Sequence, residues 1–322
     1  MNVKDMQAVI LAAGKGSRLH PITVKRSKAM LPILGKPIVE RVLENIWHIG
    51  IREFIVVVSP RDSEILQHFH HEWKLKAKVK FAIQKERLGM ANALSFAAPL
   101  IKGDFILSAC DNLVPVEHIN DLVAKFLDDK ETLATLSLTR VEKSYIPKSG
   151  IVVFEKDIVK NIVEKPSVEE APSDIGSIPL YVFKPKILKY LPEVKLSARG
   201  EYELQDAIQL LIQRDGNVTG VITKKRLYLT SPADLLRTNH HYLTHGHDKP
   251  QLSPHTVGKN TQLVTPLRID EGTKIGENCK IGPNVYIEND CQIGNGVVIK
   301  DAIILRKSII DDKAWIENTV VS

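Results

Sequence analysis

A basic, glycine-containing loop is the part of the sequence whose residue types most directly suggest chemistry. The stretch LAAGKGSRLHPITVKRSKAMLP, residues 11–32, follows a short apolar run that predicts a buried strand. Backbone N–H groups around Gly14 and Gly16 could cradle phosphates, and Arg18 and Lys28 could neutralise a leaving group. We therefore expect this loop to bind the phosphates of a nucleotide.

The loop departs from two common phosphate-binding patterns. A dinucleotide loop, G-x-G-x-x-G, would need a third glycine where Leu19 stands, and its helix would begin at once. Pro21 prevents an immediate helix, because it lacks a backbone N–H and restricts the residue before it. No Gly-Lys-Ser/Thr sequence closes the loop as in a P-loop. The sequence thus predicts a long, open and basic loop.

Alternating strand-like and helix-like segments surround this loop in residues 1–238. Short apolar runs at 54–59, 79–84 and 104–109 predict strands, because they are rich in branched and aromatic residues. Between the loop and the run at 54–59, residues 37–50 repeat apolar side chains every three or four positions and end at a glycine, which predicts a helix. This alternation is typical of an α/β domain with a Rossmann-like mixed, mostly parallel sheet and helices on both faces.

A period of six residues replaces this pattern near the C-terminus. Eight aliphatic residues are spaced six apart, and a second register follows: Val257, Leu263, Ile269, Ile275, Ile281, Ile287, Ile293 and Ile299, then Ile304, Ile310 and Ile316. Such a repeat predicts a parallel β-helix over 255–322, left-handed in hexapeptide-repeat proteins, with three hexads to each triangular coil. Cys279 and Cys291 fall at inward positions and are expected to pack in its core.

Residues 239–254 are interpreted as a linker between the two domains. They contain His240, His241, His245 and His247, which could suggest a metal site, but a histidine-rich linker is the simpler interpretation. Beyond His255 the repeat contains no histidine, so we interpret the β-helix as structural and not as an acyltransferase.

Composition limits the class of protein. Of the 322 residues, 43% are hydrophobic and 25% charged, as in soluble globular proteins, and no apolar stretch approaches the roughly 20 residues of a membrane span. The N-terminus does not resemble a signal peptide, and none of the three cysteines lies in a C-x-x-C motif, so we expect a reduced, cytoplasmic protein. The net charge of +6 suits a small anionic substrate, and no basic run indicates nucleic acid.

The loop belongs to a longer string that resembles a family signature. L-A-A-G-x-G-x-R-L-x-P-x-T, then Lys28, M-L-P and Lys36-Pro37, is similar to the signature of the sugar-1-phosphate nucleotidylyltransferases. These include glucose-1-phosphate thymidylyl- and uridylyltransferases and mannose-1-phosphate guanylyltransferases. The resemblance covers residues 6–240. Further segments that occur in the family's order are 84–91, 111–112, 149–152, 163–166 and 197–212.

The resemblance implies a reaction between two anions. A sugar 1-phosphate oxygen would attack the α-phosphorus of a nucleoside triphosphate, and pyrophosphate would leave. Positioning and charge neutralisation should dominate such a step. The resemblance assigns Arg18 to the leaving phosphates, Lys28 to the α-phosphate and Asp111 to a magnesium ion, which prefers oxygen ligands.

The resemblance also implies binding residues for both substrates. Gln84 and the backbone at Gly89 would read the base, and Lys165 would hold the sugar phosphate while Glu164 accepts sugar hydroxyls. The nucleotide-binding set is Leu11, Ala13, Gly14, Gly16, Gln84 and Gly89, and the sugar-phosphate set is Gly150, Glu164 and Lys165. Gln84 followed by a glycine five residues later fits uracil, thymine and guanine alike; UTP or dTTP and glucose 1-phosphate are the favoured pair.

One departure from the family pattern concerns the metal. In the stretch Arg226 to Leu236, Tyr228 stands where the family usually has a second magnesium carboxylate. A neutral phenol is a poor ligand for magnesium. Two hypotheses follow: an active enzyme whose magnesium is held by Asp111, substrate phosphates and waters, or a nucleotide-sugar-binding regulator with little turnover. The change at Ser177-Ile-Pro179 leaves the sugar open. The terminal coil exposes a β edge, so we also expect oligomerisation through the β-helix.

Overall fold

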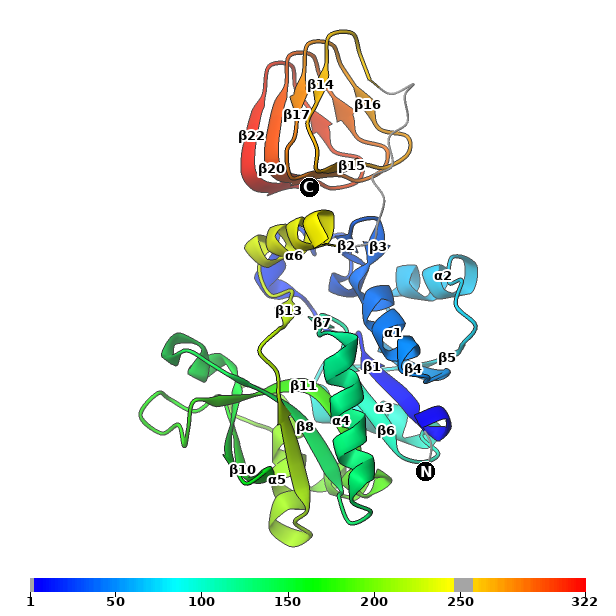
Figure 1. Cartoon of the computed structure of the whole chain (residues 1–322). Coiled ribbons are helices and arrows are strands. Elements are labelled where there is room, and N and C mark those ends of the chain that lie inside the picture. The colour runs from blue at the N-terminus through cyan, green and yellow to red at the C-terminus, as the bar shows by residue number, and fades with distance from the viewer. Residues whose placement is uncertain (1–2, 246–256) are drawn as a thin grey trace. The chain divides into compact units, whose positions relative to one another are not determined.

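A computed structural model describes residues 3–245 and 257–322, which form two compact units (Figure 1). The first unit comprises the chain up to Lys15 and Val39–Arg226, and the second comprises Gly16–Ile38 and Leu227–Ser322. The predicted boundaries at 238 and 255 stay predictions, because most of the linker lies outside the described residues. The phosphate loop is divided between the units after Lys15.

A parallel four-stranded half of the sheet forms one side of the first unit. Its order is β5 (Lys78–Ile83), β4 (Glu53–Val58), β1 (Gln7–Leu11) and β6 (Phe105–Ala109). Leu11, the last residue of β1, pairs with Val57 on one side and with Ala109 on the other. The strands predicted at 54–59, 79–84 and 104–109 are therefore confirmed, and their carboxyl ends share one edge.

The other half of the same sheet is largely antiparallel. It continues from β6 through β11 (Ile175–Phe183), β8 (Ala134–Arg140), β12 (Val218–Ile222), β10 (Ile158–Glu164) and β9 (Gly150–Glu155). Only β8 and β12 pair in parallel here. The prediction of a mixed sheet is confirmed, with the parallel pairs concentrated in the first half. A short strand, β7 (Asn112–Leu113), follows β6.

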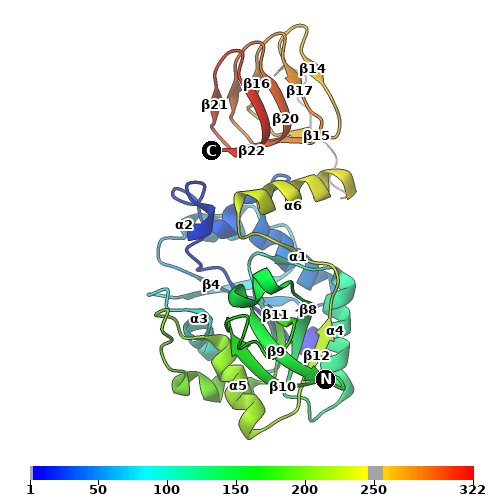
Figure 2. The same cartoon turned by 90° about the vertical axis from the view of Figure 1, so that its left-hand side faces the viewer.

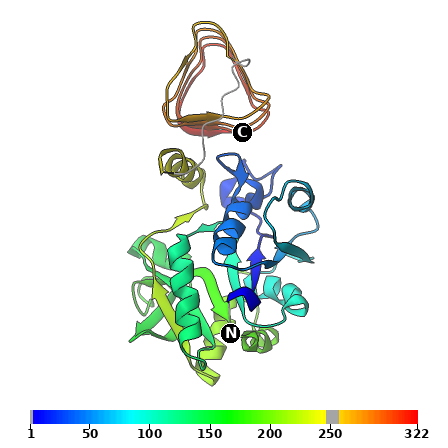
Figure 3. The ribbon, with the colours of Figure 1, turned by 45° about the vertical axis from the view of Figure 1, so that its right-hand side comes forward.

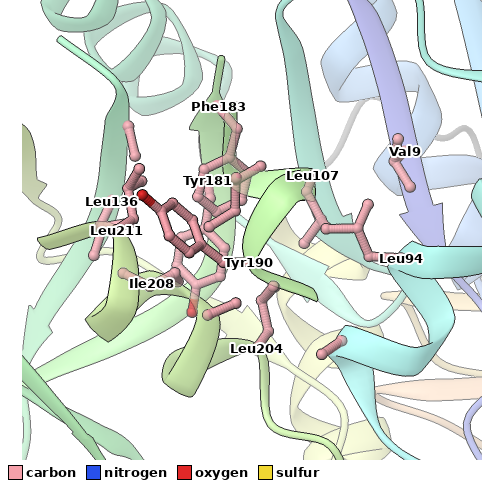
Figure 4. Packing of buried hydrophobic residues seen from close by; sticks show 14 of the residues in the cluster. Val9, Leu94, Leu107, Leu136, Tyr181, Phe183, Tyr190, Leu204, Ile208 and Leu211 are labelled. Atoms are coloured by element: carbon pink, nitrogen blue, oxygen red, sulfur yellow. The ribbon is translucent and has the colours of Figure 1, made fainter. Parts of the chain in front are cut away.

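Helices cover both faces of this sheet (Figure 1). The helices of the first unit are α1 (Ile38–His48), α2 (Ser63–His71), α3 (Met90–Ala97), α4 (Val116–Asp128) and α5 (Leu204–Arg214). Alternate residues of the central strands, such as Val9 and Leu107, pack with α3 and α5 in one apolar cluster (Figure 4). Side chains of successive strand residues point to opposite faces, so the intervening residues face the other layer.

A buried histidine links α1 to α2. Its two ring nitrogens lie 2.7 Å from Glu40 Oε2 and 2.8 Å from Glu72 Oε2, and the His68 side chain is 4% exposed. Burial alone would lower the pKa of His68, but the hydrogen bonds and charges of these two carboxylates raise it above its ordinary value.

The second unit contains a tight hairpin and a helix. Strands β2 (Pro32–Ile33) and β3 (Lys36–Pro37) are joined by Leu34 and Gly35, both with positive φ. A two-residue turn with two positive φ values is the type I′ geometry that matches the twist of a hairpin. After β13 (Leu227–Tyr228), helix α6 (Pro232–His245) packs beside this hairpin and the last coils. The first residues of the predicted linker are thus helical.

The rest of the second unit is a parallel coil of short strands, triangular when viewed along its axis (Figure 3). The strands are β14 (Gln262–Leu263), β15 (Leu267–Ile269), β16 (Lys274–Ile275), β17 (Lys280–Ile281), β18 (Val285–Ile287), β19 (Gln292–Ile293), β20 (Val298–Ile304), β21 (Ile309–Ile310) and β22 (Trp315–Val321). Leu267 pairs with Val285, one coil of 18 residues later, and Val285 pairs with Ala302, 17 residues later. The predicted coil of three hexads is confirmed. The second register of aliphatic residues, at Ile304, Ile310 and Ile316, results from one coil that is shorter by a residue. The left-handedness of the coil stays a prediction.

The repeat supplies the core of this coil, whose stacked strands are seen from another side in Figure 2. Its inward aliphatic residues form one cluster that includes Cys279 and Cys291, as predicted. Burial raises the pKa of the Cys291 thiol to about 11. Both cysteines are unpaired. Among the described helices, none is long and apolar enough to cross a membrane.

Candidate active site

Three of the predicted site segments meet at the carboxyl edge of the parallel strands. Leu11 ends β1, Gln84 follows β5 and Asp111 follows β6. Main-chain hydrogen bonds join these ends: Ala12 N donates to Val57 O (2.8 Å), Gln84 N to Val58 O (2.8 Å) and Cys110 N to Leu11 O (3.1 Å). Ligands of α/β sheets bind outside this edge, so the geometry favours a binding site here.

Gln84 is buried and oriented by its amide nitrogen. Gln84 Nε2 donates to Gly89 O (3.2 Å) and to Asn92 Oδ1 (2.8 Å). The side-chain oxygen of Gln84 is then the atom suited to accept an N–H from a base. Uracil, thymine and guanine all offer such an N–H, so the geometry alone does not choose between them.

Gly89 is required by a close approach of two backbone segments. Its φ is +95°, and a Cβ on Gly89 would lie 2.6 Å from Tyr202 O. Tyr202 N donates to Leu88 O (2.8 Å), and Ala91 N donates to Tyr202 O (3.0 Å). The segment before α3 is therefore fixed against the segment before α5, with Gln84 bonded to it.

Asp111 is the predicted metal ligand. It is partly exposed at the end of β6, and its neighbour Asn112 accepts a hydrogen bond from Arg226 Nε (2.8 Å). In the described parts of the chain, no three His, Cys, Asp or Glu side chains are grouped to share a metal ion. A single carboxylate suits magnesium, which often keeps several waters and uses substrate phosphates as ligands.

The predicted sugar-phosphate residues lie on neighbouring strands. Gly150 of β9 pairs with Glu164 of β10 and also with Ser177 of β11. Because β11 runs antiparallel to β6, its first residues lie at the edge where β6 ends. Ser177 Oγ is hydrogen-bonded to Tyr181 Oη (2.7 Å), which is completely buried. We call Gly150, Glu164, Ser177 and Gln205 the β9–β11 wall.

Two acceptor atoms in this wall are buried without a hydrogen-bond partner. They are Glu164 Oε2 and Gln205 Oε1. A Cβ on Gly150 would lie 3.1 Å from both Gln205 Cγ and Glu164 Oε2, so these two side chains pack closely against the glycine. A buried polar atom without a partner is costly, and a ligand that donates hydrogen bonds would satisfy both.

Cations surround the other oxygen of Glu164. Lys165 Nζ lies 3.0 Å and Arg199 Nη2 lies 3.3 Å from Glu164 Oε1, and Arg199 also bonds Glu203 Oε1 at 2.5 Å. Burial raises the pKa of Glu164, and the charge of Lys165 opposes this shift. Lys165 has a φ of +48°, a backbone conformation that non-glycine residues rarely adopt and that often marks functional sites.

The second part of the phosphate loop belongs to the second unit. Directly after Gly16 (φ +65°) the chain forms a short 3-10 turn, Ser17–Leu19, and no α-helix begins there, as predicted from Pro21. A second such turn, Lys28–Met30, carries the partly buried Lys28, whereas Arg18 is exposed. A Cβ on Gly16 would lie 3.0 Å from Lys28 Cβ, so glycine lets the start and end of the loop approach.

The first part of the loop is open. Ala13 is buried at the end of β1, and Gly14 is exposed with nothing within 4 Å of an added Cβ. The arrangement of Arg18 and Lys28 relative to Asp111 and Lys165 stays a prediction from the sequence.

Tyr228 contacts a cation of its own unit. The guanidinium carbon of Arg237 lies 5.2 Å from the centre of the Tyr228 ring, and Arg237 Nη2 bonds Asp234 Oδ1 (2.7 Å). The other oxygen of Asp234 accepts hydrogen bonds from the backbone and hydroxyl of Thr230. Both carboxylate oxygens of Asp234 are therefore engaged at the start of α6.

The structure adds residues that the sequence pattern does not single out. Gln205, Arg199 and Glu203 come from the segment around the start of α5, where polar residues are common at a helix N-terminus. Arg226 reaches Asn112 across 114 residues of chain. Only the buried polar character of Glu203 and Gln205 marks them, and burial is not visible without the fold.

Comparison with known proteins identifies the family of the chain. Residues 7–243 match the family model described as Nucleotidyl transferase. The chain belongs to the nucleotidyl transferase family. The prediction of an enzyme of this family is therefore confirmed. Residues 263–322 match a second model, described as GMPPB C-terminal domain.

Several curated relatives share this first domain. UTP–glucose-1-phosphate uridylyltransferase AglF of Haloferax volcanii is 33% identical over 231 residues, which cover 71% of this chain and 93% of AglF. A putative UTP–glucose-1-phosphate uridylyltransferase of Methanocaldococcus jannaschii is 29% identical, over 72% of this chain and 91% of that protein. The bifunctional protein GlmU of Methanococcus maripaludis is 32% identical over 74% of this chain, which spans 54% of GlmU.

Among solved structures, UDP-glucose pyrophosphorylase complexed with UDP-glucose superposes with a TM-score of 0.66 at 23% identity. The superposition covers 74% of this chain and 98% of the pyrophosphorylase chain. At this identity the likeness supports the mixed α/β fold of the first domain and no more.

Proposed function

We propose that this protein transfers a nucleoside monophosphate from a nucleoside triphosphate to a sugar 1-phosphate, with release of pyrophosphate. UTP or dTTP is the favoured nucleotide, and glucose 1-phosphate is the favoured sugar. The two uridylyltransferase relatives, whose names specify UTP and glucose 1-phosphate, support the UTP option and this sugar.

The observation that carries the proposal is the pair of unsatisfied acceptors in the β9–β11 wall. Glu164 Oε2 and Gln205 Oε1 need hydrogen-bond donors, which sugar hydroxyls supply. Lys165 and Arg199 lie on the other side of the same carboxylate and could neutralise a phosphate. The unsatisfied oxygens of Glu164 and Gln205 would accept hydrogen bonds from the sugar hydroxyls, and the nearby Lys165 and Arg199 would bind the phosphate.

The remaining roles follow from the resemblance to the family and stay predictions. Gln84 and Gly89 would read the base, and the N–H groups of the loop around Gly14 and Gly16 would bind phosphates. Arg18 would hold the leaving pyrophosphate, and Lys28 the α-phosphate. Asp111 would hold magnesium, which would stabilise negative charge on the α-phosphate.

The alternative function is a nucleotide-sugar-binding regulator with little turnover. Tyr228 favours it, because this residue stands where the resemblance places a metal carboxylate, and its ring faces Arg237. Replacement of Tyr228 by Asp discriminates between the two functions. An active enzyme should respond little, whereas a regulator that lost only this ligand should gain pyrophosphate release without tighter nucleotide binding.

The direct test is pyrophosphate release by the purified protein with Mg²⁺. Five nucleoside triphosphates are assayed against glucose, mannose and N-acetylglucosamine 1-phosphates. We expect release with a uridine or thymidine nucleotide and glucose 1-phosphate. No release with any pair, from protein that still binds UDP-glucose, would refute the enzyme and favour the regulator.

A matched pair of variants then tests the sugar-phosphate wall. Lys165→Ala should raise KM for the sugar 1-phosphate and leave KM for the nucleotide unchanged. Lys160→Ala removes an exposed lysine of β10, the strand that ends just before Lys165, and should change neither constant. Equal effects of the two variants would contradict a specific role for Lys165.

A further inference from the structure

A buried ion pair holds the middle of the phosphate loop. Arg26 Nη1 and Nη2 bond the two carboxylate oxygens of Glu288 at 2.8 and 2.6 Å. The two side chains are 10% and 6% exposed, and both residues belong to the second unit. Arg26 stands two positions before Lys28, and Glu288 follows β18 of the parallel coil. A long-range contact therefore fixes the loop next to its candidate catalytic lysine.

Both carboxylate oxygens of Glu288 accept hydrogen bonds. Besides Arg26, its Oε2 accepts a hydrogen bond from Arg306 N in the next coil (2.9 Å). Bidentate arginine–carboxylate pairs fix orientation as well as distance. Exposed pairs such as Lys300–Glu317 lack this restriction, because water competes for both partners. The coil thus offers Arg26 one defined position.

The end of the loop is anchored to the same coil. Gly35 N donates to Tyr286 Oη (3.0 Å), and Tyr286 Oη donates to Asp270 Oδ2 (2.7 Å). Asp270 Oδ1 accepts from Arg268 Nε (2.7 Å). A Cβ on Gly35 would lie 2.2 Å from an Arg268 nitrogen, so the hairpin turn and the coil are fitted closely.

Helix α6 adds a third attachment. Leu34 N donates to Asn239 Oδ1 (2.9 Å), and Asn239 Nδ2 donates to Pro32 O (3.1 Å). Leu34 is buried with a φ of +46°, a conformation that needs such support. Lys28 therefore lies between an anchor at Arg26 and anchors on the hairpin.

We propose that the Arg26–Glu288 pair is a positioning contact for Lys28, so that the parallel coil takes part in nucleotide turnover. This inference rests on the proposed function, in which Lys28 binds the α-phosphate. A catalytic group that is displaced by about 1 Å can lose on the order of 10²-fold in rate. A loop that carries Lys28 needs such precision, and Glu288 supplies it from the coil.

The test compares Glu288→Gln, Arg26→Gln and the double variant in the full-length chain. Each single variant leaves one partner of a buried pair without its counterpart. We expect kcat to fall by about 10²-fold with UTP and glucose 1-phosphate, while KM for the sugar phosphate stays unchanged. The double variant should be no worse than the worse single variant, because both act through one contact.

Glu317→Gln is the matched control, since it breaks an exposed ion pair of the same coil and should leave kcat unchanged. Glu288→Asp keeps the charge and should recover part of the activity, and it replaces Glu288→Gln if that variant does not fold. Hydrogen exchange of the peptide 16–38 in full-length protein should be faster in Glu288→Gln than in Glu317→Gln.

The outcomes separate this inference from the proposed function. If wild-type protein releases no pyrophosphate with any substrate pair, the proposed function fails and the positioning role fails with it. If wild-type protein is active and the folded Glu288 variants keep full kcat, only the positioning role is overturned. A rise in both KM values together with a lower melting temperature would also overturn it, because that pattern indicates general destabilisation.

Discussion

Replacement of Gly89 by alanine should disturb base recognition and stability together. Gly89 has φ +95° and ψ 179°, a region that is essentially restricted to glycine. An alanine Cβ would lie 2.6 Å from Tyr202 O and 2.9 Å from Tyr202 N, closer than side-chain carbons normally approach backbone atoms. Both neighbours are main-chain atoms, so the two segments must move apart.

The cost can be worked out from these contacts. The backbone conformation contributes about 1–3 kcal/mol. Separation of the segments weakens the Tyr202–Leu88 and Ala91–Tyr202 hydrogen bonds, at about 1 kcal/mol each. We expect Gly89→Ala to destabilise the first unit by about 3–5 kcal/mol. Weakening of the Gln84–Gly89 hydrogen bond should raise KM for the nucleotide roughly fivefold.

Gly216→Ala is the matched control for this prediction. Gly216 also has a positive φ, +69°, but nothing lies within 4 Å of an added Cβ, so only the backbone cost of about 1–2 kcal/mol applies. The assay is thermal unfolding followed by KM for UTP and for glucose 1-phosphate. Equal destabilisation by the two variants, with unchanged KM for UTP in Gly89→Ala, would refute the reasoning.

Three further predictions concern other parts of the chain. The pKa of His68 is raised in the folded state, so the wild-type protein should have a higher unfolding free energy than His68→Gln, most clearly below about pH 6.5. Urea titrations should show this difference shrinking as the pH rises through the raised pKa of His68. Ile281→Ala should lower the unfolding free energy by about 2–5 kcal/mol, because Ile281 is completely buried. In the same denaturant assay, Ile309→Ala should change the unfolding free energy by less than about 0.5 kcal/mol, because Ile309 is 71% exposed. If the protein oligomerises through its β-helix, Trp315→Glu, at another residue 71% exposed, should reduce the assembly in gel filtration, and an unchanged elution volume would oppose this surface as the interface.

Local patterns in the sequence predict local structure well. The apolar runs around β1, β4, β5 and β6 and the six-residue period depend on neighbours along the chain, and the structure has strands at each of them. The antiparallel half of the sheet is harder to predict, because the order of β8 to β12 is set by pairing between distant segments. The grouping of 16–38 with the C-terminal unit is likewise invisible locally, since Arg26 and Glu288 are 262 residues apart.

The site shows the same division. Motifs identify Gly150, Glu164 and Lys165, and strand pairing places Gly150 opposite Glu164. Gln205 is not identified, because a glutamine near a helix start has many ordinary roles. Its importance comes from an unpaired oxygen that only the packed structure reveals.

The shortened coil has a consequence for how this domain tolerates changes in length. In an ordinary sheet, a deletion of one residue moves every following side chain to the opposite face. Here the 17-residue coil still places Ile304 on Ile287, because the corner at Asp301, with φ +45°, absorbs the missing residue. A corner can thus lose a residue without changing which side chains of the neighbouring strands pair. Length variation among proteins with this repeat should therefore accumulate at corners, while the flat sides keep their spacing.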